Sequence, residues 1–174
     1  KKPAYAGRLL SKDMHIADYE LSNESDWVGK TLGELSFGQR YGVHVVSILR
    51  GNRRINIPGA NVRLFPTDKL QVIGTDEQQI LFGEAMKQCV TIVDADEFEK
   101  GEMILRQLLI DENSPFLGKT LKDAGIRQKY HCLVAGIEHD DASLHDPTPN
   151  EPLMNGDVLW VVGETKDVFS LINA

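Results

Sequence analysis

Val43–Gly74 reads VHVVSILRGNRRINIPGANVRLFPTDKLQVIG, and this stretch decides the fold. It opens on an apolar, β-branched run, passes through the polar turn Arg50–Arg54 and returns through Ile55–Ile57. A further apolar run begins after Asp68. Short runs rich in Val and Ile, bounded by Gly, Pro, Asn and Asp, are typical of β-strands. The stretch therefore predicts a β-hairpin followed by another strand.

The same organisation recurs later in the chain at one fixed offset. Gly29-Lys-Thr-Leu32 reappears as Gly118-Lys-Thr-Leu121, which is an offset of 89 residues from 29 to 118. Self-similarity at a fixed spacing indicates one structural unit used twice. Two copies are too few for a solenoid, so we predict a pair of similar small domains. Other pairs at this offset are Tyr41 and Tyr130, Val45 and Val134, Pro58 and Pro147, Leu64 and Leu153, Asp68 and Asp157, and Gly74 and Gly163.

The composition is that of an ordinary globular protein. Of the 174 residues, 41% are apolar and 26% are charged. No apolar run approaches the roughly 18 residues that would predict a membrane span. A net charge of −7 argues against nonspecific binding to nucleic acid. The two cysteines do not form a disulfide framework, and Cys132 lies in an apolar run that predicts a core position.

The repeat divides the chain into four segments. Residues 1–13 are basic and are predicted to be a linker from an upstream membrane part of the polypeptide. Residues 14–85 form the first copy, and residues 103–174 form the second. Residues 86–102 are predicted to be an acidic connector, in which Cys89–Val93 is read either as a strand or as an extended segment.

Helix starts are predicted from capping residues. Thr31-Leu-Gly-Glu34 fits a capping box, and Thr75 followed by two acidic residues predicts a second helix. Ile80, Leu81 and Met86 are predicted to form the buried stripe of that second helix. Trp27 and Phe116 occupy the same place in the two copies, so they are predicted to fill each core or an interface between the copies.

These elements predict the α+β class. Each copy is expected to be a β-α-β-β-β-α unit, with a mostly antiparallel sheet and helices on one face. The two units are expected to pack as a pseudo-dimer.

The layout resembles a known family, the regulator of potassium conductance C-terminal domain, also called the TrkA C-terminal domain. Three pieces of the first copy carry the resemblance: Val46-Ser-Ile-Leu-Arg50, Pro58, and Asp68-Lys-Leu-Gln-Val-Ile-Gly74. The second copy matches through Val134-Ala-Gly-Ile, Pro147 and Gly156-Asp-Val-Leu-Trp-Val-Val-Gly163, and it departs by having His139 where the first copy has Arg50.

The resemblance implies a cytosolic sensor module attached to potassium channels, potassium uptake systems or cation:proton antiporters. Such modules usually dimerise, and some bind cyclic di-AMP at the dimer interface. The usual companion is a Rossmann domain with the pattern G-x-G-x-x-G, which does not occur in this sequence. We therefore expect no NAD binding and no tightly bound cofactor, with cyclic di-AMP as a possible ligand.

The basic hairpin turn is the candidate ligand site. Guanidinium groups bind phosphate through paired hydrogen bonds, and asparagine side chains can recognise a base edge or a ribose hydroxyl. Two other interpretations remain open: an ordinary solvated hairpin tip, and an internal interface at which this basic turn pairs with the acidic turn of the second copy. The predicted ligand-binding residues are Arg50, Asn52, Arg53, Arg54, Asn56 and Arg63.

Catalytic and metal-binding residues are not predicted. His44 and Ser47 lack the surroundings of a general base or a nucleophile, and Gly29-Lys30-Thr31 lacks the upstream glycine of a phosphate-binding loop. The loop His139–Asp146 holds histidines and aspartates, but its spacing matches no calcium or zinc pattern, so an acidic solvated loop is favoured.

The sequence thus predicts a regulatory, ligand-sensing module at the cytoplasmic face of the membrane. This module would regulate a monovalent cation transporter, a K+ or Na+:proton antiporter, whose transport domain is part of the same polypeptide. Homodimers are expected, a small nucleotide is the expected ligand, and nucleic acid is not an expected partner. The alternative is a ligand-free dimerisation module that holds transporter protomers together.

Overall fold

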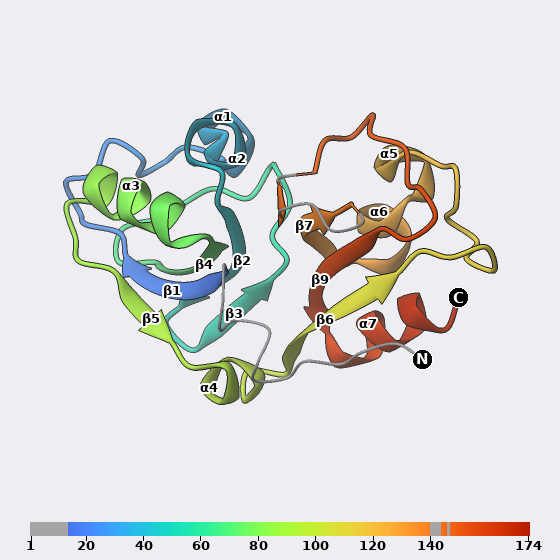
Figure 1. The fold of residues 1–174 in the computed structure, drawn as a ribbon. Coiled ribbons are helices and arrows are strands. Elements are labelled where there is room, and N and C mark those ends of the chain that lie inside the picture. Colours follow the sequence, from blue (N-terminus) through green and yellow to red (C-terminus); the bar gives the residue numbers. More distant parts are fainter. Residues whose placement is uncertain (1–13, 140–143, 146) are drawn as a thin grey trace. The chain divides into compact units, whose positions relative to one another are not determined.

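The computed structural model describes residues 14–139, 144–145 and 147–174, which form two units, residues 14–97 and residues 98–174 (Figure 1). Each unit has its own β-sheet and its own cluster of buried apolar side chains. All strand pairs in both sheets are antiparallel, so the predicted α+β class with antiparallel sheets is confirmed. Within these described residues, no helix is long and apolar enough to span a bilayer.

The first unit is a five-stranded sheet in the order β3-β2-β4-β1-β5. Its strand β5 comes from the segment predicted as a connector, and it pairs with the outer edge of β1. The helix α4(Ala95–Glu99) follows β5. The elements are β1(His15–Glu20), α1(Leu32–Leu35), α2(Phe37–Tyr41), β2(His44–Arg50), β3(Arg53–Asn56), β4(Lys69–Gly74), α3(Asp76–Met86) and β5(Thr91–Val93).

One face of this sheet is covered by α1, α2 and α3 (Figure 1). Successive side chains of a strand point to opposite faces, so alternate strand residues meet the helices. Trp27 lies inside this core, with its ring centroid 4.8 Å from that of Phe37 and 5.6 Å from that of Phe82. The prediction of a core position for Trp27 is confirmed. The buried cluster also contains Ala17, Tyr19, Leu35, Val45, Ile48, Leu70 and Val72.

The single helix predicted between the first two strands is two short helices. Thr31 caps α1 through the predicted capping box with Glu34. Ser36 then adopts a left-handed conformation, with φ +51°, and the chain restarts as α2. Because a left-handed residue cannot continue an α-helix, one predicted helix becomes two.

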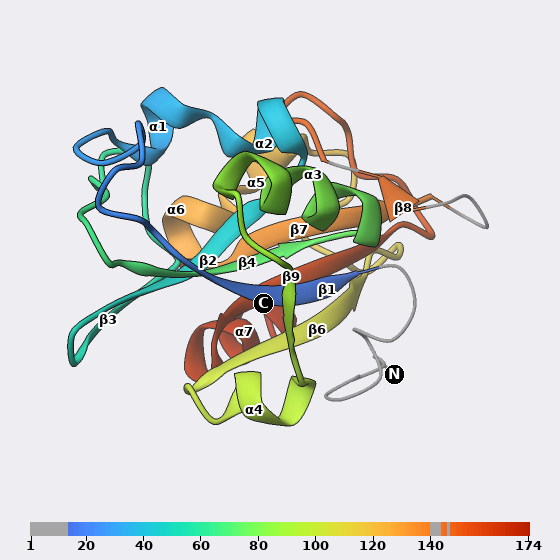
Figure 2. The same cartoon turned by 90° about the vertical axis from the view of Figure 1, so that its left-hand side faces the viewer.

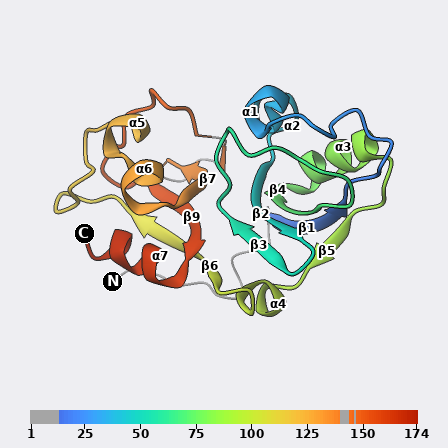
Figure 3. The same cartoon turned by 180° about the vertical axis from the view of Figure 1, so that it is seen from behind.

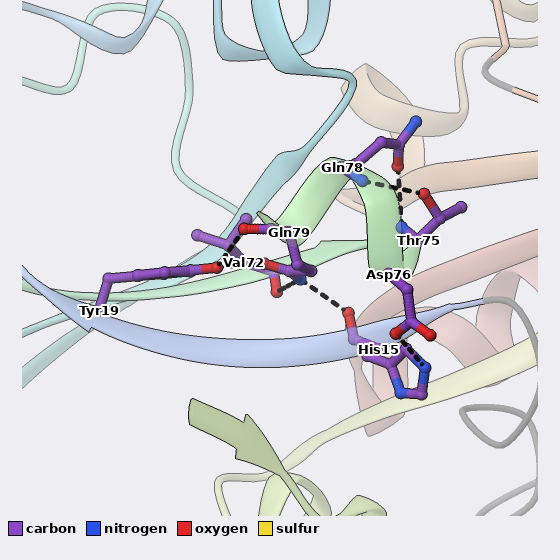
Figure 4. A network of polar contacts seen from close by, with 7 residues as sticks. All are labelled: His15, Tyr19, Val72, Thr75, Asp76, Gln78 and Gln79. Atoms are coloured by element: carbon purple, nitrogen blue, oxygen red, sulfur yellow. Dashed lines mark hydrogen bonds and ion pairs between the residues drawn. The ribbon is translucent and has the colours of Figure 1, made fainter. Parts of the chain in front are cut away.

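The predicted buried stripe of α3 is wrong for Ile80 and Leu81, which are each 54% exposed. The helix instead buries Gln79, Phe82 and Gly83. Gln79 is a polar core residue because the sheet and Tyr19 satisfy its amide (Figure 4). Its Nε2 donates to the carbonyls of His15 and Val72, and the Tyr19 hydroxyl donates to its Oε1 at 2.6 Å.

The second unit is a four-stranded sheet in the order β6-β9-β7-β8. The strands β6, β9 and β7 are labelled in Figure 3, and β8 is labelled in Figure 2. Its core contains Phe116 and Cys132, as predicted, and burial raises the pKa of the Cys132 thiol to about 12. Helices α5, α6 and α7 all contribute side chains to this core. The elements are β6(Met103–Leu109), α5(Leu121–Ala124), α6(Ile126–Tyr130), β7(Leu133–Glu138), β8(Leu144–His145), β9(Val158–Glu164) and α7(Thr165–Ile172).

The repeated Gly-Lys-Thr-Leu motif has the same structural role in both units. Gly29 and Gly118 have φ near +85°, at +87° and +83°, a region that favours glycine. Each glycine N–H donates to the carbonyl of a buried leucine at 2.8 Å, Leu64 in the first unit and Leu153 in the second. The following threonine caps a short helix in each copy. The motif is therefore a turn that joins the first short helix of each unit to the loop before β4 or β9.

Candidate functional site

The predicted ligand residues lie on and around the hairpin between β2 and β3 (Figure 2). Arg50 and Arg53 face each other across a two-residue turn formed by Gly51 and Asn52. Gly51 has φ +63°, a conformation that two-residue hairpins require and that glycine adopts without strain. Asn52, Arg53 and Arg54 are exposed.

Arg50 is held by the protein itself. Its Nε and Nη2 donate to the two carboxylate oxygens of Asp68, each at 2.8 Å, and Nη2 also donates to the Arg63 carbonyl at 2.9 Å. The guanidinium stacks on Phe65, 4.3 Å from the ring centroid. The Asp68 side chain is fully buried, and it also accepts the Phe65 N–H at 2.9 Å. A paired arginine–carboxylate contact of this kind is among the stronger hydrogen-bonded pairs.

The pKa of Arg50 is raised above its ordinary value because the guanidinium is hydrogen-bonded to Asp68. The pair fixes the end of β2 to the start of β4 across the loop between β3 and β4. For a ligand to recruit Arg50, it would have to break this pair and leave a buried carboxylate without its cation.

The other predicted residues are divided between the two faces of the hairpin. Ser47 and Asn56 lie opposite each other, and Arg54 pairs with Leu49 next to them. The Ser47 hydroxyl donates to Asn56 Oδ1 at 3.2 Å, and Arg54 Nη1 donates to the Ser47 Oγ at 3.2 Å. Ile48, which faces α1, α2 and α3, lies between Ser47 and Leu49, so Arg54 and Asn56 occupy the opposite face of the sheet.

Arg63 lies near Arg50 and contacts the turn that contains Gly29. Its Nη1 donates to the Gly29 carbonyl, and its backbone bridges to Thr31. The structure therefore brings Arg50 together with Arg63 and places Arg54 with Asn56. It leaves Asn52 and Arg53 exposed at the tip.

The second copy repeats the arrangement with a different cation. His139 occupies the position of Arg50, and its Nδ1 lies 2.6 Å from the Oδ1 of Asp157, the counterpart of Asp68. Asp157 Oδ2 accepts the Met154 N–H at 2.9 Å, as Asp68 accepts the Phe65 N–H. The other ring nitrogen of His139 contacts the Glu151 carboxylate. Sequence reasoning noted the recurrence of Asp68 and Asp157, but it did not identify them as the partners of Arg50 and His139.

Hydrogen bonding to Asp157, and then to Glu151, raises the pKa of His139 above its ordinary value. These carboxylates favour the charged imidazolium, which has two N–H donors. The second copy thus has a cation that titrates at the position where the first copy has a permanent one.

The structure also has two shallow hollows at matching places. They have volumes of about 380 Å³ and 160 Å³. The first lies between the segment after β1 and the end of α3, and the second lies between the segment after β6 and the end of α7. Trp27 and Met86 line the first, and Phe116 and Leu171 line the second. The predicted ligand residues do not line either hollow.

A metal centre does not form within the described ranges, which contain no group of three or more His, Cys, Asp or Glu side chains arranged to hold an ion. The loop weighed above as a metal alternative, His139–Asp146, falls largely outside those ranges.

A protein-family model matches both copies of the repeat. The TrkA-C domain matches residues 16–87 and again residues 105–173.

Relatives of the chain include transporters and a channel. The uncharacterized transporter YfbS of Escherichia coli (strain K12) is 23% identical over 149 residues, which is 82% of this chain and 24% of that protein. The probable potassium channel protein 2 of Methanocaldococcus jannaschii is 33% identical over 78 residues, which is 45% of this chain and 22% of that protein. The chain therefore spans about a quarter of the length of these relatives.

Solved structures also match in part. The RCK_C domain dimer of S. agalactiae BusR in complex with c-di-AMP has a TM-score of 0.41 and 20% sequence identity. The match covers 44% of this chain and 94% of that chain.

Proposed function

Because this chain belongs to the TrkA-C domain family and holds two copies of that domain, we propose that it is the regulatory module of a membrane transporter for a monovalent cation. TrkA-C domains are non-catalytic regulators of ion transport, so the module senses a signal and performs no reaction. The tandem family match carries this proposal. The names transporter and potassium channel among the relatives support it.

The finer proposal is a K+ or Na+:proton antiporter whose transport domain lies in the same polypeptide, with this module at the cytoplasmic face. The module forms homodimers and responds to a small nucleotide, for which cyclic di-AMP is the first candidate. Binding shifts the module between two arrangements, which requires the ligand to have different affinities for them.

The exposed tip of the β2–β3 hairpin supports the ligand part of the proposal. Asn52 and Arg53 are exposed at the tip, and Arg54, also exposed, lies with Asn56 on one face of the hairpin, where it donates to Ser47. Such groups suit the phosphates and base edges of a cyclic dinucleotide. Arg50 supports the site indirectly, since its pair with Asp68 fixes the strand from which the tip extends.

Isothermal titration of the chain with cyclic di-AMP, with ATP and NADH as comparators, tests the ligand. We expect micromolar or tighter binding of cyclic di-AMP alone. The double variant Arg53→Ala/Arg54→Ala should weaken it about tenfold or more, since two charge-assisted contacts are lost. Arg40→Ala is the matched control, because it removes an exposed arginine of α2, away from the hairpin.

If none of the three nucleotides binds, cyclic di-AMP is not the ligand. If the double variant binds cyclic di-AMP with unchanged affinity, the hairpin tip is not the binding site. Light scattering, which measures the oligomeric state, tests the alternative of a ligand-free dimerisation module. A dimer that binds no nucleotide would favour the ligand-free dimerisation module, whereas a chain that stays monomeric at high concentration would exclude it.

A further inference from the structure

The position shared by Arg50 and His139 differs between the copies in one chemical respect. In each copy a side chain at the end of a strand contacts a buried aspartate at the start of the next long strand, Asp68 or Asp157. Arginine stays charged at every physiological pH, whereas histidine changes charge near neutrality.

The second acceptor also differs between the copies. Arg50 also donates a hydrogen bond to the backbone carbonyl of Arg63, which is neutral. His139 instead contacts the carboxylate of Glu151, and the first copy has Val62 at the position of Glu151. His139 therefore lies between two carboxylates, which suits an imidazolium with a proton on each ring nitrogen.

A neutral imidazole cannot keep both contacts. With one proton left, one ring nitrogen presents a lone pair to a carboxylate oxygen, and that contact becomes repulsive. The Asp157 side chain is 3% exposed and also accepts the Met154 N–H, so it stays in place. The Glu151 side chain is 16% exposed and lies outside the long strands, and its Oε1 accepts the Thr148 N–H at 3.4 Å. It is the more exposed of the two carboxylates, so it is the one that turns away from the ring.

We propose that His139 is a pH-sensitive contact, which ties the segment 147–157 to the end of β7 when protonated and releases Glu151 when it loses a proton. Among the described residues, the carboxylates in contact with the ring are those of Asp157 and Glu151, and Glu138, the last residue of β7, precedes His139 in the chain. The matching contact in the first copy, Arg50 with Asp68, does not respond to pH.

The raised pKa of His139 gives the direction of the response to pH. The stabilising contact is fully present below the ordinary histidine pKa of 6.5 and is lost as pH rises through the higher folded-state pKa. The response therefore lies above pH 6.5, and it needs neither a ligand nor a transport domain.

Hydrogen–deuterium exchange of the chain at pH 6 and at pH 8.5, corrected for the intrinsic exchange rate, tests the proposal. We expect protection of the peptide spanning 147–157 to fall at the higher pH, while the matching first-copy peptide, 58–68, keeps its protection. The variant His139→Arg should keep the 147–157 segment protected at both pH values. The proposal is overturned if the protection of 147–157 in the unaltered chain is the same at both pH values. It is also overturned if this protection falls as much in H139R as in the unaltered chain.

An NMR titration of the unaltered chain keeps the test decisive if the variant folds poorly. The His139 ring should titrate above 6.5, together with shifts of the Glu151 amide signal. A ring that titrates without any effect on Glu151 would also overturn it. The titration uses no nucleotide, so its failure is distinguishable from a failure of the ligand proposal.

Discussion

At several matching positions the backbone is left-handed in both copies, but only one copy has a glycine there. Ser36 has φ +51° where the second copy has Gly125 at +68°, and His131 has φ +56° where the first copy has Gly42 at +77°. The third case is Thr67 at φ +66°, which corresponds to Gly156 at +96°. A β-branched residue is strained in this region, because its side chain meets the backbone.

We therefore expect Thr67→Gly to stabilise the first unit by about 1 kcal/mol. Removing the strain of a left-handed threonine should raise the free energy of unfolding by about 1–3 kcal/mol. The greater conformational entropy of glycine in the unfolded chain should lower it by about 0.5–1 kcal/mol. Urea unfolding measures the change. Thr67→Ala is the matched control, because alanine keeps the positive φ and should bring no comparable gain. A loss of stability in T67G would contradict the interpretation of Thr67 as strained.

At the scale of elements, the packing of α3 on its sheet depends on one buried polar pair. The Tyr19 hydroxyl and the Gln79 amide bond to each other beneath the helix (Figure 4). The second copy has Leu108 and Val168 at these positions, both buried and apolar. The same helix-on-sheet contact is thus built once with hydrogen bonds and once without them.

A double-mutant cycle with Tyr19→Phe and Gln79→Val tests the pair. Each single variant leaves a buried polar atom without its partner and should cost about 1–2 kcal/mol. The double variant should cost about 1 kcal/mol less than the two single costs combined, because the hydrogen bond between the Tyr19 hydroxyl and the Gln79 amide is lost only once, while the His15 and Val72 carbonyls lose their donor in Gln79→Val and in the double variant alike. Urea unfolding gives all three values. Strict additivity would show that the two side chains act independently.

At the scale of the whole molecule, the two units share no strand among the described residues and have separate core clusters. The chain's two tryptophans are divided between them, Trp27 in the first and Trp160 in the second. Trp27→Phe and Trp160→Phe therefore give chains in which fluorescence reports on one unit at a time.

In these single-tryptophan chains we expect Phe82→Ala to lower the unfolding midpoint of the first unit alone. Loss of a buried phenylalanine from the aromatic cluster should cost about 3–5 kcal/mol. The Trp160 signal should keep its midpoint, since Phe82 is not part of the second core. Equal shifts of both signals would show that the units unfold as one cooperative block.

Local features of this protein were determined by the sequence alone. The offset repeat, the strands around Val45 and Leu70 and the caps at Thr31 and Thr75 all depend on residues close together in the chain. Apolar patterning and capping express short-range preferences, so they can be read without knowing the fold. The family resemblance follows from the same local motifs, and the tandem family match confirms it.

Only the tertiary structure decided which polar groups meet. Arg50 finds Asp68, and His139 finds Glu151, across loops whose course no local pattern specifies. The buried stripe of α3 was misjudged for the same reason, because Gln79 can be buried only where Tyr19 and two strand carbonyls satisfy its amide. Hydrogen bonds and charge pairs need positions fixed to within a fraction of an ångström, and only the packed fold supplies that geometry.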